Sequence, residues 1–545
     1  MKKYTKLIVT LLLTLSTTAI SSPTDFDNDG IPNSIETNLG LDPNVAADAL
    51  LDLDGDGWIN LDEFRLGTEL DNDQSTPLDQ VNPHQKVFGS EDNGGAAFGS
   101  TLAISGNTAV IGECTQSAVA INSVYVFVFD NGIWTEQERL VDSSAEPEDR
   151  YGCQVAIDGN TVLVGAVNDI EEGSKTGSVS VFERNEGIWS LQAKLLPTPK
   201  RGPGGFGHSL SIDGDTAVIG RNDSHESYVF VRNSGSWTQQ SLLTPSDGIS
   251  GKFGFSVAVQ GDTAIIGAPM DNSNGMNSGS AYLYTRSNGV WTEEAKIVSD
   301  DIEAYDWFGS SVAINDGTVA IGAVEYQYQA EEEGAAYIFI RTGSLWQQQA
   351  KLKASDGVDG DRFGTSVSLA GDILLVGSPH RNAYSGGAYL FSRNGGSWTE
   401  LSLIEPYDVT YIDYHGSTVA LSGDFALTGS KWADVNHSIS GAAYFFDLDL
   451  DDDGLLNSFE ISMGTDPKRE DSDSDGLNDG DEVNLYHTDP MLTDTDGDGY
   501  SDGTEVNAGS DPLSGDLIPD EEIPLPLWSV VLLGAALIRI GAKLS

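Results

Sequence analysis

The chain has 545 residues, more than a single hydrophobic core normally holds, so two or more domains are expected. Hydrophobic residues make up 39% of it and 10 are Trp, which excludes a wholly disordered protein. The 84 acidic and 28 basic residues give a net charge of −56, which disfavours nucleic acid and anionic lipid as partners and favours cations.

Residues 1–22 have the features of an export signal. Positions 1–6 contain three lysines, and residues 7–15 form an apolar run that is too short to span a membrane stably. Small residues follow, so cleavage is expected after Ser21 or Ser22. We therefore predict a signal peptide and a mature chain that folds outside the cytoplasm, where disulfides persist.

Two acidic loops follow within residues 23–76, both with the spacing Asp-x-Asp-x-Asp-Gly-x-x-Asn-x-x-Glu. Positions one, three, five, seven, nine and twelve are Asp25, Asp27, Asp29, Ile31, Asn33 and Glu36 in the first loop, and Asp52, Asp54, Asp56, Trp58, Asn60 and Glu63 in the second. The two loops begin 27 residues apart, which leaves too little chain for a pair of helices around each. Helix-loop-helix hands are therefore not expected.

This spacing suits Ca²⁺, which takes roughly six to eight oxygen ligands in flexible geometry. The glycine at position six turns the chain sharply, position seven offers its backbone carbonyl, and the final glutamate can bind through both oxygens. Without a cation, carboxylates this close together would repel one another strongly. We therefore predict calcium loops rather than a merely solvated acidic surface.

A repeat of about fifty residues occupies 84–446. An aromatic-Gly string followed by a short apolar run recurs seven times, 47 to 55 residues apart, beginning at Phe98, Tyr151, Phe206, Phe253, Phe308, Phe363 and, in degenerate form, His415. Each unit contains further apolar runs with period-two alternation, separated by Gly and Asn turns, which is typical of four short strands. Helical signals are missing. Seven such units predict an all-β fold, a seven-bladed β-propeller.

The two ends of this array are complementary. The seventh unit lacks the Trp-containing fourth strand of the others, whereas residues 84–88 match the end of that strand elsewhere, for example at 193–195. We expect the strand at 84–88 to complete the last blade and close the ring, which hides the sheet edges.

The repeats resemble the FG-GAP repeat of bacterial surface proteins, which is related to the propeller of integrin α-chains. The motifs that carry the resemblance are Phe98-Gly99, Phe253-Gly254 with Gly267-Ala268-Pro269, and Phe363-Gly364 with Gly377-Ser378-Pro379. In integrins several blades carry Asp-rich calcium loops between strands. No blade here contains Asp-x-Asp-x-Asp, so calcium binding is not carried over to the propeller.

The chain has two cysteines, Cys114 and Cys153. Cys114 ends a second strand and Cys153 begins the inner strand of the next unit, so both belong to the same face of adjacent blades. A disulfide between them and two free buried thiols are both compatible with this placement.

Three more loops with the acidic spacing lie within residues 447–516. Their corresponding positions are Asp449, Asp451, Asp453, Leu455, Asn457 and Glu460; Asp471, Asp473, Asp475, Leu477, Asp479 and Glu482; and Asp494, Asp496, Asp498, Tyr500, Asp502 and Glu505. With their Gly-x-Asp-Pro phrases, such as 464–467, these loops resemble bacterial thrombospondin type 3 repeats, over about residues 25–74 and 449–516. The resemblance implies mostly irregular, calcium-stabilised segments in which about five Ca²⁺ ions replace a hydrophobic core, so their order should depend on calcium.

Residues 517–545 end in an apolar stretch of about 15 residues, which is marginal for a membrane span. An acidic run precedes this stretch, and Arg539 and Lys543 follow it. The tail resembles PEP-CTERM sorting signals, which implies retention in the inner membrane until a sorting enzyme removes it. A plain C-terminal anchor is the competing interpretation. Either way, we expect an exported chain at the cell surface or outside the cell, with membrane contact only through this tail.

The sequence contains neither Gly-x-Ser-x-Gly nor His-Glu-x-x-His, and we predict that the protein is not an enzyme. The expected function is that of an exported calcium-binding surface protein, with the propeller mediating adhesion or matrix interaction through an extracellular protein or glycan. Variable loops between second and third strands, such as 270–278 and 325–333, are the expected contacts. A structural spacer without a specific ligand and a secreted polysaccharide-active enzyme are the alternatives.

Overall fold

The structure is a computed structural model in which two parts of the chain can be described. The described residues are 80–515 apart from 82–84, 90–96, 115–121, 131–132, 172, 201–203, 222–224, 249–250, 325–332, 344, 395, 407–411, 424, 436–437, 450, 452, 456–459, 461–462 and 467–468. The predicted signal peptide, the first two acidic loops and the C-terminal tail lie outside them. The chain divides into two compact units, Met1–Leu448 and Asp449–Ser545.

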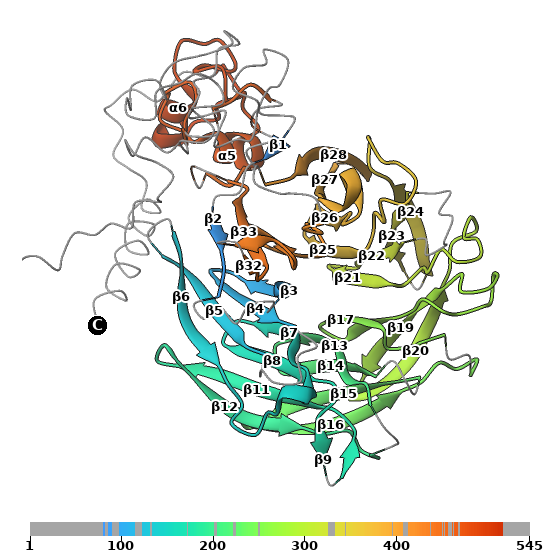
Figure 1. Ribbon diagram of the computed structural model, residues 1–545. Coiled ribbons are helices and arrows are strands. Elements are labelled where there is room, and N and C mark those ends of the chain that lie inside the picture. The colour runs from blue at the N-terminus through green and yellow to red at the C-terminus, as the bar shows by residue number, and fades with distance from the viewer. Residues whose placement is uncertain are drawn as a thin grey trace, which may run out of the picture. The chain divides into compact units, whose positions relative to one another are not determined.

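The first unit is a seven-bladed β-propeller (Figure 1). Blades 1 to 3 comprise β3 (Phe98–Ser105), β4 (Thr108–Glu113), β5 (Val124–Asp130) and β6 (Ile133–Leu140); β7 (Tyr151–Asp158), β8 (Thr161–Ala166), β11 (Ser178–Asn185) and β12 (Ile188–Leu195); and β13 (Phe206–Asp213), β14 (Thr216–Arg221), β15 (Glu226–Asn233) and β16 (Ser236–Leu243). Blades 4 and 5 comprise β17 (Ser256–Gln260), β18 (Thr263–Ala268), β19 (Ser280–Ser287) and β20 (Val290–Ile297); and β21 (Ser311–Asn315), β22 (Thr318–Ala323), β23 (Ala335–Thr342) and β24 (Leu345–Leu352).

The last two blades each contain a strand from the N-terminal side of the array. Blade 6 comprises β25 (Ser366–Ala370), β26 (Ile373–Gly377), β27 (Ala388–Asn394) and β28 (Ser397–Ile404), with β1 (Gln80–Val81) added in parallel at its edge. Blade 7 comprises β29 (Thr418–Ser422), β30 (Phe425–Ser430), β33 (Ala442–Asp447) and β2 (Gln85–Val87). The β1 strand is not among the strands predicted from the sequence.

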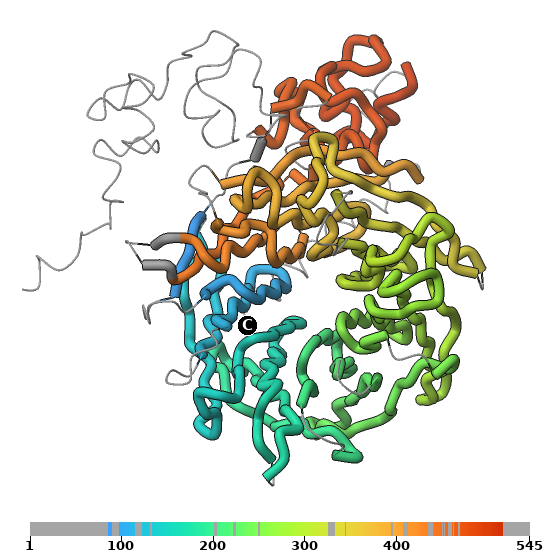
Figure 2. The backbone as a smooth tube through the Cα atoms, turned by 45° about the vertical axis from the view of Figure 1, so that its right-hand side comes forward, coloured from blue at the N-terminus to red at the C-terminus, as the bar shows by residue number. Residues whose placement is uncertain are grey.

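The first strand of every blade contacts the first strands of both neighbouring blades, and β29 returns to β3, so these strands surround a central axis (Figure 2). Because each blade is an antiparallel meander, the start of strand one, the end of strand two, the start of strand three and the end of strand four meet at one end of the sheet. The 2–3 loops and the turns before the first strands therefore share one face, here called the 2–3 face.

The repeated aromatic residue packs between blades. Phe253 is fully buried in a cluster that includes Val218 and Val229 of blade 3, and its ring centroid lies 5.4 Å from that of Tyr282 and 6.1 Å from that of Tyr284 in blade 4. Burial of each such ring contributes roughly 2–3 kcal/mol. The following Gly254 has φ +88, and a Cβ there would press on the backbone of blade 3, so glycine is required.

The seam between blades 7 and 1 is joined at both edges. At the outer edge, β2 pairs with β33, and the amide of Gln85 bonds the backbone N and O of Trp134 at 2.7 and 2.8 Å. At the inner edge, the Phe98 N–H donates to Ser440 O at 2.8 Å. The ring is therefore closed by hydrogen bonds and packing at this seam.

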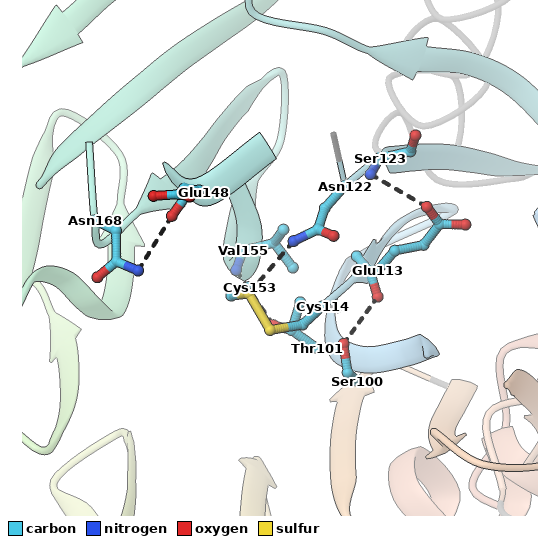
Figure 3. Close-up of a disulfide and its surroundings, with 11 residues drawn as sticks. Ser100, Thr101, Glu113, Cys114, Asn122, Ser123, Glu148, Cys153, Val155 and Asn168 are labelled. Atoms are coloured by element: carbon cyan, nitrogen blue, oxygen red, sulfur yellow. Dashed lines mark hydrogen bonds between the residues drawn. A yellow bond between two sulfur atoms is a disulfide. The ribbon is translucent and has the colours of Figure 1, made fainter. Parts of the chain in front are cut away.

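The seam between blades 1 and 2 contains a covalent bond (Figure 3). Cys114, directly after β4, forms a disulfide with Cys153 in β7. The Asn122 Nδ2 group lies 3.7 Å from Cys153 Sγ. Of the two arrangements open from the sequence, the structure has the disulfide.

Short elements elsewhere complete the described chain. They are η1 (Pro147–Asp149), the hairpins β9 (Ile170–Glu171) with β10 (Ser174–Lys175) and β31 (Asp434–Val435) with β32 (Ser438–Ile439), and α3 (Arg381–Tyr384) in the first unit, and α5 (Asp479–Asp481), η2 (Glu482–Tyr486) and α6 (Asp502–Ala508) in the second. None of the helices within the described ranges has the length and apolar character that crossing a membrane requires.

Candidate calcium sites

Carboxylates gather in the second unit at the first three aspartates of each acidic loop. Oxygens of these side chains lie within 4.8 Å of one another in each of three groups: Asp449, Asp451 and Asp453; Asp471, Asp473 and Asp475; and Asp494, Asp496 and Asp498. A fourth group joins Asp453 and Glu460 to Asp479 of the next loop. In the described parts of the chain, these are the groups of three or more acidic, His or Cys side chains that could hold a metal ion.

Each loop is shaped by its own aspartates. Gly476, with φ +97, donates its N–H to Asp471 Oδ2 at 2.9 Å, and the N–H of Leu477 bonds Asp475 Oδ1 at 2.9 Å. Gly499 and Asp494 repeat the first of these contacts at 2.8 Å. Both oxygens of Asp471 accept backbone N–H bonds, whereas Asp473 Oδ2 in the same group has no hydrogen-bond partner among the described residues.

The glutamates at position twelve are buried without compensation. Glu460, Glu482 and Glu505 have no exposed surface, and within the described structure both oxygens of Glu460 and Glu505 lack a hydrogen-bond partner. Glu482 accepts one bond, from Thr488 Oγ1 at 3.0 Å. An unpaired buried carboxylate costs several kcal/mol, which a bound cation would offset.

The protonation equilibria point the same way. Burial and the charges of Asp451 and Asp453 raise the pKa of Glu460 to about 9, and burial with Asp473 nearby raises the pKa of Glu482 to about 8. A raised carboxyl pKa indicates negative charge that the protein alone does not balance. Clustered hard oxygens fit Ca²⁺ better than a soft transition metal, so the donor set matches the predicted ion.

The aspartate at position nine makes hydrogen bonds within its own loop. Asp479 accepts hydrogen bonds from Ser472 N at 2.8 Å and Ser472 Oγ at 2.6 Å, and Asp502 is held in the same way by Thr495. Neither belongs to the three-aspartate group of its own loop. Asn457, at position nine of the third loop, lies outside the described residues, as do all ligands of the first two loops.

The sequence carries a signal for this pairing that spacing alone does not reveal. Where position nine is Asp, position two is Ser472 or Thr495; where position nine is Asn, position two is Phe26, Leu53 or Leu450. A hydroxyl at position two therefore accompanies an aspartate that it can bind.

Successive loops are also joined to each other. Asp453 Oδ2 accepts a hydrogen bond from Gly480 N at 2.9 Å, and Asp475 Oδ2 accepts one from Gly503 N at 2.6 Å. A Cβ at Gly480 would collide with the carbonyl oxygen of Asp453. The fifth residue of one loop is thus held by the tenth residue of the next, and this contact requires glycine there.

Comparison with protein families places both units. The FG-GAP repeat matches residues 82–129, 134–182, 237–284, 291–339, 346–391 and 398–446, more than half of the chain. The chain belongs to the FG-GAP repeat family. Blade 3 falls largely outside these FG-GAP matches, yet its strands pair as in the other blades. The bacterial TSP3 repeat matches 449–470, 471–492 and 494–515, the three described calcium-type loops.

Curated relatives of the FG-GAP region are integrin α-chains. Integrin alpha-D of Homo sapiens is 26% identical over 178 residues, which are 29% of this chain and 15% of the integrin. Integrin alpha-2 of Bos taurus is 30% identical over 135 residues, 22% of this chain and 11% of the integrin. The chain therefore spans only a small part of the length of these relatives.

Among solved structures, that of U3-55K has a TM-score of 0.43 at 12% identity, and the match covers 67% of this chain and 98% of the other. At this score the likeness supports no functional argument. TSP3 repeats are calcium-binding, and the combination of FG-GAP propeller and TSP3 repeats is that of extracellular, integrin-like surface proteins.

Proposed function

We propose that the protein is an exported calcium-binding surface protein whose propeller binds an extracellular protein or glycan in adhesion or matrix contact. The observation that carries the proposal is the pair of buried glutamates without hydrogen-bond partners, Glu460 and Glu505, in TSP3 loops of a chain that also contains an FG-GAP propeller. Export rests on the sequence of residues 1–22, and retention at the surface rests on residues 517–545.

Each of the three loops in the second unit would hold one ion. The ligands in a loop would be its three aspartates, its position-twelve glutamate and the backbone carbonyl of Leu455, Leu477 or Tyr500. Asp479 and Asp502 orient the loop backbone through Ser472 and Thr495. With the two N-terminal loops, the chain would bind about five ions. Among the described residues of the second unit, few apolar side chains are buried, for example Leu455 and Leu477. The bound ions would stabilise this unit in place of a larger apolar core.

The ligand would bind on the 2–3 face of the propeller. The loops between second and third strands differ most in length and composition from blade to blade, while the strands below them repeat. Variable loops on a rigid scaffold are the usual place for recognition. Residues 270–278 belong to this face, whereas 325–332 lie outside the described residues.

The test uses the mature full-length chain. Isothermal titration should show uptake of about five Ca²⁺ ions, and chelation should increase protease cleavage in 449–516 while leaving the β-signal of the propeller. Immobilised protein should then retain members of a panel of extracellular glycans and matrix proteins. Absence of any retained ligand, with calcium bound, would leave the protein as a spacer; turnover of a polysaccharide would make it an enzyme.

A further inference from the structure

Aromatic and cationic side chains gather on the 2–3 face where blades 6 and 7 meet. Five residues, here called the aromatic–cationic cluster, are His380, Tyr384, Tyr414, Lys431 and Trp432. Tyr414 is at the centre: its ring centroid lies 5.5 Å from that of His380, 5.6 Å from Tyr384 and 5.3 Å from Trp432. The Lys431 Nζ atom lies 5.4 Å from the same ring.

Two of these aromatic residues are partly exposed to solvent, Tyr384 over 40% and Trp432 over 48% of its surface. A large exposed aromatic group with a fixed neighbour gives a flat, rigid contact surface at low entropic cost. The apolar faces of pyranose rings stack on such surfaces, while the sugar hydroxyls stay solvated.

The charge of this cluster is opposite to that of the whole chain. Most propeller cations are paired with carboxylates, as Arg286 is with Asp262 and Lys296 with Asp271. Lys431 forms no ion pair with the described residues and instead stands over Tyr414. Burial and the nearby charge of Arg362 lower the pKa of Lys431, and burial with Arg362 and Lys431 lowers the pKa of His380 to about 4. The Lys431 ammonium has no carboxylate partner among the described residues and therefore favours an anion.

The cluster is held in place by backbone contacts. The loop after β26 is fixed by two backbone hydrogen bonds. The N–H of His380 donates to the carbonyl oxygen of Asp361 at 3.1 Å, and the N–H of Tyr414 donates to that of Tyr384 at 3.0 Å. Arg381 pairs with Asp356 at 2.8 Å and Glu405 at 2.6 Å. A site fixed before binding spends less free energy on ordering its side chains.

The backbone of the same loop is strained. Asn382, Ala383 and Tyr384 have φ of +46, +56 and +74, a conformation that non-glycine residues rarely adopt. Such residues cost of order 1 kcal/mol each and persist where surrounding contacts hold a functional geometry.

We propose that the aromatic–cationic cluster binds an anionic polysaccharide of the uronic-acid type, with Trp432 and Tyr384 stacked on sugar rings and Lys431 pairing with a carboxylate. The inference rests on the proposed function and names the ligand class for it. Neutral glycans would lack the ion pairs, and acidic peptides would lack the ring faces.

The experiment titrates the calcium-loaded mature chain with a short oligogalacturonate and with its methyl ester, which has the same rings without the charge. We expect the acid to bind and the ester to bind at least about tenfold more weakly. Trp432→Ala and Lys431→Gln should each weaken binding of the acid about tenfold. Lys175→Gln, an exposed lysine of β10 on the same face, is the matched control and should change nothing.

Thermal unfolding of each variant is compared with that of the wild type, because Trp432 is exposed but Lys431 is partly buried, and only variants with an unchanged midpoint count as binding variants. Equal binding of acid and ester, or full binding by both cluster variants, overturns the inference. A glutamate-rich peptide that needs Lys431 but not Trp432 would make the ligand an acidic peptide instead. If the immobilised protein retains a ligand whose binding does not change in the cluster variants, only this inference fails. If it retains no ligand at all, the proposed function fails.

Discussion

His415 occupies the position that Phe or Tyr holds in the other six blades. It is fully buried, packs edge-on at 5.4 Å from the ring of Tyr444, and its Nδ1 lies 2.9 Å from Ser430 Oγ. Burial lowers its pKa to about 3, so the folded protein holds it neutral at physiological pH. The propeller thus contains one base that folding prevents from being protonated.

Replacing this pair should reduce acid sensitivity. Blades 4 and 5 have Ala268 and Ala323 where blade 7 has Ser430, so the matched variant is H415F/S430A. The folded pKa lies below the ordinary histidine value, so the unfolded state takes up the proton first and wild type loses stability as pH falls from about 6.5 towards 3. The free energy of unfolding of the variant minus that of the wild type should be about 3 kcal/mol larger at pH 4 than at pH 7. Urea unfolding followed by Trp fluorescence measures this; an equal difference at both pH values contradicts it.

Glu505→Gln tests the ion-binding role of position twelve. Gln keeps the shape of a side chain whose two oxygens are buried without partners among the described residues, but removes its charge. Calcium affinity at the last loop should fall by about tenfold or more because a bidentate anionic ligand is lost. Titration calorimetry should resolve one weakened site, and Glu470→Gln, at an exposed residue of the same unit, should leave all sites unchanged.

At the scale of elements, a glycine in a short helix allows two successive acidic loops to pack closely. Gly480 lies in α5, where Ala would favour an isolated helix by about 1 kcal/mol. A Cβ there would instead strike Asp453 O and displace the N–H that binds Asp453 Oδ2. Gly480→Ala should therefore destabilise the second unit, with cleavage by protease at lower temperature in calcium. Gly515→Ala meets only the Cβ of Asp498, at 3.7 Å, and should be neutral.

Strand content and blade number follow from the sequence because each unit repeats the same apolar periodicity and turn residues. Features set by a single tertiary neighbour do not. The parallel pairing of Gln80 and Val81 with β28 depends on two residues without a pattern. The hydrogen bonds from Ser472 to Asp479 and from Gly480 to Asp453 join residues of suitable type whose pairing appears only once the loops are stacked. The loop spacing predicted the aspartate groups because successive ligands are local in the chain.

At the scale of the whole propeller, the ring has one seam with a covalent bond and one that depends on a short strand. The disulfide joins blades 1 and 2, whereas blade 7 joins blade 1 through a shared apolar core, in which Trp134 stacks on Phe445, and through β2 at its outer edge. The β2 strand has only three residues, so its detachment from β33 costs little free energy and exposes the edge of β33.

Val87→Asp should open this seam. Val87 is only 5% exposed and packs with Phe98 and Tyr125 of blade 1, so a buried carboxylate there would cost several kcal/mol. We expect an unfolding midpoint lower by at least about 5 °C and concentration-dependent association through the freed edge of β33, since an unpaired strand edge recruits another. Phe88→Asp is the control, because Phe88 is 49% exposed and next in the chain. If both variants unfold with the wild type and stay monomeric, β2 does not hold the ring. Reducing the disulfide should lower the free energy of unfolding by the same amount in the wild type and in Val87→Asp. Such additivity means that the two seams act independently, as their positions on opposite sides of blade 1 require.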